Sequence, residues 1–152
     1  MNYKRLSFRG KHIHYGLQGE GYPVVFIHGF LLSSQIVGAF GNQLAGKYRL
    51  ITIDLPGHGL SDSYAPDHSM ECMADTVNAV LKEERVEAYA LVGHSMGGYV
   101  ALALWERYPE NLESVILMNS HPFADSQERK RERERINALI RKKGPNKANI
   151  NG

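Results

Sequence analysis

The sequence predicts an α/β fold, with a mostly parallel sheet and helices on both of its faces. From position 24 onward, short apolar strands alternate with stretches of helical spacing. The strands expected at 24–27 and 88–92 are apolar almost throughout, which is typical of parallel strands buried on both faces. The chain has 152 residues, 43% hydrophobic and 22% charged, the composition of one water-soluble globular domain.

Six strands and four helices are expected in order along the chain. The first two strands form a hairpin that turns at Arg9-Gly10. The strands are expected at residues 3–8, 12–17, 24–27, 48–53, 88–92 and 114–118. The helices are expected at 34–45, 69–84, 96–108 and 126–143, and Pro109 closes the third of them. These elements predict a core at 1–125, a separate helix at 126–143 and a disordered tail at 144–152.

Charge is distributed unevenly along the chain. The net charge is +2 overall, but it is −4 over residues 1–125 and +6 over residues 126–152. A basic tail of this kind fits either a nucleic-acid or anionic-surface partner or a solvated helix. Residues 131–135 alternate Arg with Glu, which gives i, i+4 pairs, and no aromatic residue is interleaved for stacking on bases. We therefore expect no nucleic-acid partner.

Cysteine use and the lengths of the apolar stretches indicate where the protein resides. Cys72 is the single cysteine, and no apolar leader follows Met1, so we expect a reduced, cytoplasmic protein. The longest apolar stretches are far shorter than the roughly 20 residues that a transmembrane helix requires. We therefore expect no membrane span.

The most specific motif is Gly93-His94-Ser95-Met96-Gly97, between the strand at 88–92 and the helix at 96–108. Small flanking residues at such a turn let the serine adopt a strained backbone with its hydroxyl exposed. The N–H groups that begin the helix also favour a negative charge beside Ser95. The alternative is a glycine-rich turn that only packs a helix on a sheet.

Two further motifs lie at the ends of other strands. His28-Gly29-Phe30 follows the strand at 24–27, and Asp54-Leu55-Pro56-Gly57-His58-Gly59-Leu60-Ser61 follows the strand at 48–53. In order and spacing, the three motifs resemble the α/β-hydrolase superfamily, in its esterase, perhydrolase and cofactor-free C–C hydrolase branch. We expect Asp54 to hydrogen-bond backbone amides of its own loop.

This resemblance implies a serine hydrolase that acts on a small ester-like molecule without a metal or an organic cofactor. Ser95 would be the nucleophile that forms an acyl-enzyme, and the backbone N–H groups of Phe30 and Met96 would form the oxyanion hole. The residues expected to support the site structurally are His28, Gly29, Gly93, His94 and Gly97.

The resemblance also implies that the catalytic acid and histidine follow Ser95 in the chain. It covers the sequence to about Phe123, which is about the first half of a typical family member. Within the sequence, His121 and Asp125 are the candidates for base and acid. The position of His121 usually belongs to the pocket wall in this family, and Asp125 lies where some lipases carry their acid.

The family order predicts a sheet truncated after its sixth strand, with residues 126–143 as the start of a helical cap. The strand at 114–118 would then be an uncovered sheet edge that favours pairing with another chain. We therefore expect self-association through this edge. The alternative function is an inactive fragment that assembles with a partner there. The cap and later loops shape the pocket in this family, so the sequence does not specify the substrate.

Overall fold

The computed structural model describes residues 1–143, and the disorder expected at 144–152 falls outside them. The chain divides into two compact units, Met1–Pro122 and the segment from Phe123 onward. The division lies three residues before the boundary expected at 125, so Asp125 belongs to the second unit.

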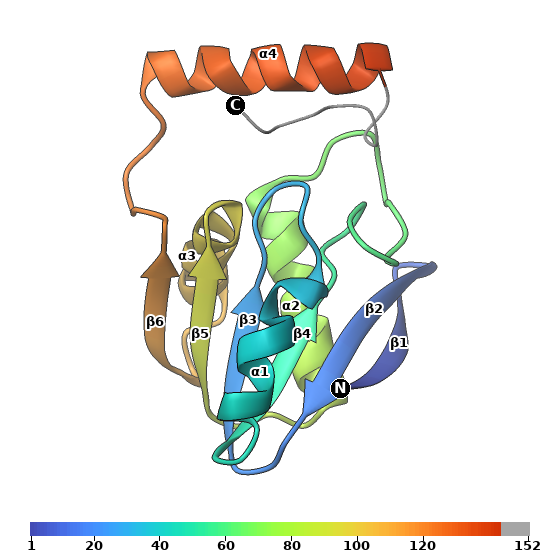
Figure 1. The fold of residues 1–152 in the computed structure, drawn as a ribbon, viewed down its shortest axis with the longest axis vertical. Helices are drawn as coiled ribbons and strands as arrows, with labels where there is room; N and C mark the ends of the chain where they lie inside the picture. The colour runs from blue at the N-terminus through green and yellow to red at the C-terminus, as the bar shows by residue number, and fades with distance from the viewer. Residues whose placement is uncertain (144–152) are drawn as a thin grey trace. The chain divides into compact units, whose positions relative to one another are not determined.

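The first unit is built on a six-stranded mixed sheet (Figure 1). Its strands are β1 (Asn2–Phe8), β2 (Lys11–Gln18), β3 (Tyr22–Ile27), β4 (Tyr48–Ile53), β5 (Tyr89–His94) and β6 (Leu112–Met118), in the spatial order β1-β2-β4-β3-β5-β6. The pairs β4–β3, β3–β5 and β5–β6 are parallel, while the pairs β1–β2 and β2–β4 are antiparallel. The predicted mostly parallel sheet, and the hairpin at its start, are confirmed.

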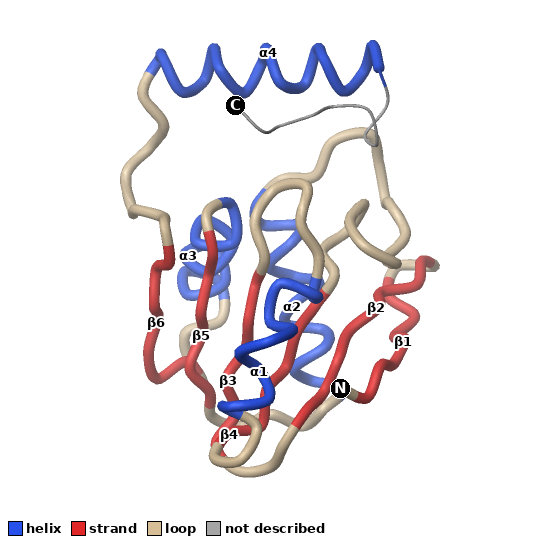
Figure 2. Tube along the Cα trace, in the orientation of Figure 1, coloured by secondary structure: helices blue, strands red, loops and turns tan. Residues whose placement is uncertain are grey.

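Helices cover both faces of the sheet (Figures 1 and 2). The 3-10 helix η1 (Ser34–Val37) and α1 (Gly38–Leu44) lie on one face, and α2 (Met70–Glu83) and α3 (Met96–Arg107) lie on the other. The single helix expected at 34–45 is therefore two elements, which meet at Gly38 with φ −28° and ψ −80°. The other two helices begin within one residue of their predicted starts.

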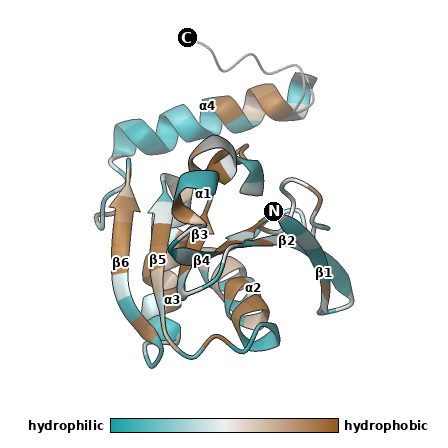
Figure 3. Cartoon of the chain, turned by 60° about the horizontal axis from the view of Figure 1, so that its bottom comes forward, coloured by the Kyte–Doolittle hydropathy of each residue, from teal (hydrophilic) through white to brown (hydrophobic). Residues whose placement is uncertain are grey.

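Each face of the sheet carries its own hydrophobic cluster, and Figure 3 shows the apolar strands between the helices. Neighbouring residues of a strand point to opposite faces. Thus Val25 and Ile27 of β3 pack in the cluster of α2 and α3, whereas Phe26 packs with Val37 in the other. Burying each such side chain contributes roughly 1.5–3 kcal/mol, which fixes the central strands and the loops at their ends.

The strand β6 forms one edge of the sheet, as predicted. Within residues 1–143 it pairs with β5 and with no second strand. Ile116 is 52% exposed and Met118 is 39% exposed. This edge therefore presents apolar side chains together with unpaired backbone groups.

The second unit contains α4 (Gln127–Lys143), in agreement with the helix expected at 126–143. Ser126 caps it, because its Oγ accepts a hydrogen bond from the Arg129 N–H at 3.2 Å. Asp125 forms an ion pair with Arg133 of the same helix at 2.6 Å. None of the helices within residues 1–143 combines the length and the hydrophobicity needed to cross a bilayer.

Candidate active site

Ser95 occupies the sharp turn from β5 into α3, with φ 51° and ψ −115°. An L-residue other than glycine rarely adopts such a positive φ, and the surrounding structure must hold it there. The Ser95 N–H donates to the Met118 carbonyl at 2.9 Å, and the Ser95 carbonyl accepts from the Gly98 N–H at 3.0 Å. The half-buried Ser95 hydroxyl makes no hydrogen bond within residues 1–143 and does not cap α3. The strained backbone expected from the motif is present, whereas the serine expected to be exposed is half-buried.

Glycines let the loop after β3 approach the turn from β5 into α3 closely. A Cβ on Gly97 would collide with the backbone carbonyl of Ile27, at the end of β3. A Cβ on Gly29 would lie 3.0 Å from His94 Nδ1 and 3.2 Å from the Ser95 Cβ. The loop after β3 and the start of α3 therefore pack directly against each other, without side chains between their backbones.

Several backbone N–H groups beside this turn have no acceptor among the described residues, and two of them come from different segments. One belongs to Phe30, in the loop after β3, and the other to Met96, the first residue of α3. The first N–H groups of a helix lack partners within the helix, and the helix dipole places a partial positive charge there. These are the two amides that the family resemblance implies for an oxyanion hole.

His28 ties the loop after β3 to the loop after β4. Its Nδ1 donates to the Gly29 carbonyl at 2.8 Å, and its Nε2 accepts from the Leu55 N–H at 3.0 Å. Both bonds together require a neutral ring, and burial lowers the pKa of His28 to about 4. Because both nitrogens are engaged, His28 acts as a structural brace and is not available as a base.

Asp54 joins the same two loops through its carboxylate and is only 2% exposed. Its Oδ1 accepts from the Ser34 N–H at 2.6 Å, and its Oδ2 accepts from the Leu60 N–H at 3.0 Å. Burial alone raises the pKa of Asp54, but the hydrogen bonds from Leu60 and Ser34 outweigh it and lower the pKa. The predicted contacts with backbone amides are confirmed. The sequence did not indicate the third partner, His14 Nδ1, at 2.9 Å.

The candidate base and acid have partners of their own. His121 Nε2 lies 3.5 Å from Tyr99 Oη of α3, and the two rings meet at 90° with their centroids 5.9 Å apart. Asp125 lies in the second unit and pairs with Arg133. Their proposed roles in proton transfer stay predictions.

Two buried polar atoms near the turn have no hydrogen-bond partner within the described part of the chain. They are His94 Nδ1 and Ser120 Oγ. Ser120 belongs to no motif, and sequence reasoning missed it. The one sequence feature connected with Ser120 is the glycine at position 98, because a Cβ on Gly98 would collide with the Ser120 side chain. Over residues 1–143, no three His, Cys, Asp or Glu side chains gather as metal ligands do.

Comparison with protein families and curated sequences gives consistent matches. The family model described as alpha/beta hydrolase fold matches residues 22–148. A pimeloyl-[acyl-carrier protein] methyl ester esterase of Nitrosomonas europaea is 32% identical over 110 residues, which are 72% of this chain and 42% of that protein. A serine hydrolase-like protein of Danio rerio is 35% identical over 107 residues, which are 68% of this chain and 32% of that protein.

Solved structures of similar fold include two enzymes. A thermophilic esterase from Thermogutta terrifontis superposes with a TM-score of 0.85 at 31% identity, over 95% of this chain and 55% of that one. An N-acyl homoserine lactonase complexed with N-butanoyl homoserine superposes with a TM-score of 0.75 at 32% identity, over 82% of this chain and 47% of that one. The chain spans about a third to a little over half the length of these four proteins.

Proposed function

The chain belongs to the α/β-hydrolase fold family, and from this premise we propose that it is a serine hydrolase of small carboxylic esters or related carbonyl compounds. The backbone of Ser95 carries the proposal, because it holds a strained conformation beside two N–H groups that have no acceptor within residues 1–143. The similarity to an esterase and a lactonase supports a substrate with an ester-like carbonyl.

In the proposed reaction, Ser95 Oγ attacks the carbonyl carbon of the substrate. The carbonyl oxygen becomes an oxyanion, which the Phe30 and Met96 N–H groups would bind. When this intermediate collapses, the bond between the carbonyl carbon and the leaving oxygen breaks, and the leaving oxygen takes up the proton that Ser95 lost and departs as an alcohol. The acyl group stays on Ser95. Water then releases the acid and restores the serine. In acyl-transfer enzymes, one such oxyanion donor contributes about 10²–10³-fold in rate.

The attack requires a base to accept the Ser95 proton. His28 does not suit this role because both of its ring nitrogens are engaged. His121 is the one histidine after Ser95 in the sequence, which is the order that the family resemblance implies. We propose it as the candidate to test within this chain.

Labelling with a fluorophosphonate probe, followed by intact-mass and peptide analysis, tests the nucleophile. We expect one adduct on Ser95, and none in the variant Ser95→Ala. Ser120→Ala is the matched control, which should label like the unmodified chain because the Ser120 hydroxyl is buried. A rate that falls in His121→Gln would support His121 as the base. An adduct on another residue, or none on folded protein, would contradict the proposal.

We also propose that a second copy of the chain, and no nucleic acid, pairs with the β6 edge. The exposed side chains of Ile116 and Met118 support this pairing. Light scattering should show a dimer that Ile116→Lys converts to a monomer. Leu139→Lys changes an exposed leucine of α4 and serves as the control. A monomer at all protein concentrations would contradict this second proposal.

A further inference from the structure

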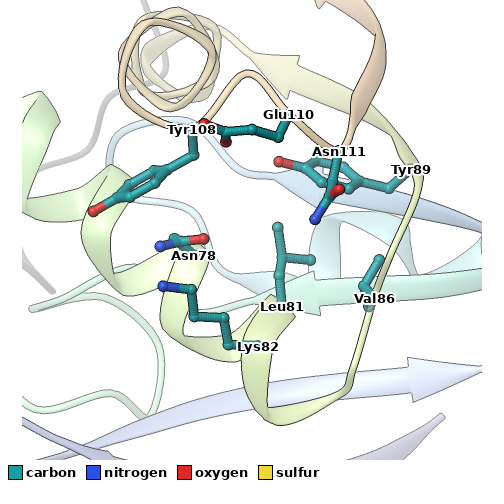
Figure 4. A pocket seen from close by; sticks show the side chains of 8 residues that line it. All are labelled: Asn78, Leu81, Lys82, Val86, Tyr89, Tyr108, Glu110 and Asn111. Atoms are coloured by element: carbon teal, nitrogen blue, oxygen red, sulfur yellow. The ribbon is translucent and has the colours of Figure 1, made fainter.

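A small cavity lies where β5 and β6 begin, at the end of these strands opposite to the Ser95 turn. Its volume is about 280 Å³. The end of α2, the loop into β5, and the loop between α3 and β6 enclose it (Figure 4). Its lining residues are Asn78, Leu81, Lys82, Val86, Tyr89, Tyr108, Glu110 and Asn111. The proposed reaction at Ser95 uses none of them.

The floor of the cavity is apolar except for one hydroxyl. Leu81 and Val86 are buried, and Tyr89 is 2% exposed. The Tyr89 hydroxyl points into the cavity in Figure 4 and makes no hydrogen bond within residues 1–143. Burial and the nearby charge of Glu110 raise the pKa of Tyr89 to about 12, so the hydroxyl keeps its proton. The hydroxyl is therefore a hydrogen-bond donor that faces the cavity and that a bound molecule could use.

The mouth of the cavity carries one cation, one anion and two amides. Lys82 and Asn78 come from α2, and Glu110 and Asn111 come from the loop before β6 (Figure 4). The Lys82 ammonium lies 5.9 Å from the centroid of the Tyr108 ring. Neither Lys82 nor Glu110 forms an ion pair with any described residue. Both charges are therefore available to a ligand.

We propose that this cavity binds a free α-amino acid with a small side chain. Its carboxylate would meet Lys82 and the Asn78 amide, and its ammonium would meet Glu110. Its side chain would lie on Leu81 and Val86, within reach of the Tyr89 hydroxyl. A simple carboxylate would face Glu110 unpaired, and a simple amine would face Lys82 unpaired, so the two mouth charges select a zwitterion.

NMR titration of the 152-residue protein tests the proposal. The probes are L-valine and two molecules with the same branched body but one charge each, isobutyrate and isobutylamine. We expect L-valine to shift the side-chain amide signals of Asn78 and Asn111 saturably, in Ser95→Ala as well. The singly charged probes should bind about 10-fold more weakly, because each loses a charge-assisted hydrogen bond.

L-threonine tests the role of Tyr89, because it has the shape of L-valine and carries a hydroxyl. We expect it to bind about 5-fold more tightly than L-valine, and the preference should disappear in Tyr89→Phe. Lys82→Met and Glu110→Gln should each weaken binding about 10-fold, whereas the exposed controls Lys47→Met and Glu87→Gln should not. No saturable shift with either amino acid, equal binding of isobutyrate, or unchanged binding in Lys82→Met would overturn the proposal.

Discussion

The two sides of the Ser95 turn differ in how their buried polar groups are paired. Toward β3 and β4, His28 uses both ring nitrogens and Asp54 accepts bonds from two loops. Toward β6, Ser120 Oγ is buried without a partner in the described chain. An unpaired buried group costs roughly 1–3 kcal/mol. On the oxyanion side, His28 and Asp54 are thus fully paired and only His94 Nδ1, beside Gly29, has no partner among the described residues. On the β6 side, the Ser120 hydroxyl retains capacity for a further hydrogen bond.

The largest effect should come from removing the carboxylate that organises the paired side. Asp54→Ala leaves the Ser34 and Leu60 N–H groups and His14 without their buried acceptor, and we expect a loss of about 3–5 kcal/mol in the free energy of unfolding. Urea denaturation measures it. The control is Asp62→Ala, which removes an exposed carboxylate and should cost under about 1 kcal/mol. Equal losses would mean that the network around Asp54 contributes little.

Lowering the pH should destabilise the side toward β3 and β4 by protonating His28. The pKa of His28 is about 4 in the folded chain and about 6.5 when unfolded. Between these two pKa values the unfolded state binds more protons than the folded state. The contribution of neutral His28 to the free energy of unfolding is therefore complete above pH 6.5 and is lost as the pH falls toward 4. The loss amounts to about 3 kcal/mol. Denaturant unfolding across this range should show it. His28→Gln should flatten the dependence, whereas His12→Gln, at an exposed histidine, should preserve it.

A methyl group at the contact between the two sides should have an intermediate effect. Gly97→Ala would push α3 away from the Ile27 carbonyl, and we expect a loss of about 1–3 kcal/mol. Fluorophosphonate labelling at Ser95 should slow in the same variant. Gly46→Ala is the control, because a Cβ there meets open space. Unchanged stability in Gly97→Ala would show that the close packing is easily relaxed.

The smallest effect should come from the unpaired side. Ser120→Ala removes a hydroxyl that has no partner in the described part of the chain, so the free energy of unfolding should stay the same or rise by up to about 1 kcal/mol. Ser61→Ala provides the contrast, because the Ser61 hydroxyl donates to the Asp54 carbonyl at 2.6 Å and accepts from the His14 N–H at 2.8 Å. Ser61→Ala should lower the free energy of unfolding by about 1–3 kcal/mol. A loss in Ser120→Ala would mean that its hydroxyl is paired in solution.

The strands and most helices could be predicted because their apolar period is a local property of the sequence. The division at Gly38 could not, since four residues of a 3-10 helix and the first turn of an α-helix have nearly the same spacing. The division after Pro122 depends on contacts between residues far apart in the chain, which sequence periodicity does not show.

The prediction of the site shows the same division between local and long-range signals. The strained backbone of Ser95 and the bracing contacts of His28 and Asp54 agree with the motifs, because each motif fixes a turn next to its own strand. The pairing of His14 with Asp54 was missed, because it arises only when β2 lies beside β4 in the sheet. Ser120 was missed because α3 has to approach the end of β6.

The shared carboxylate of Asp54 also has a consequence for motion. The Ser34 N–H and the Leu60 N–H, 26 positions apart in sequence, bind the same side chain. Neither loop can open alone without leaving a buried charge poorly solvated, so both amides should exchange with deuterium through one shared opening event. The loops after β3 and β4 are thus expected to fluctuate as one cooperative unit, although no backbone hydrogen bond between them is needed to couple them.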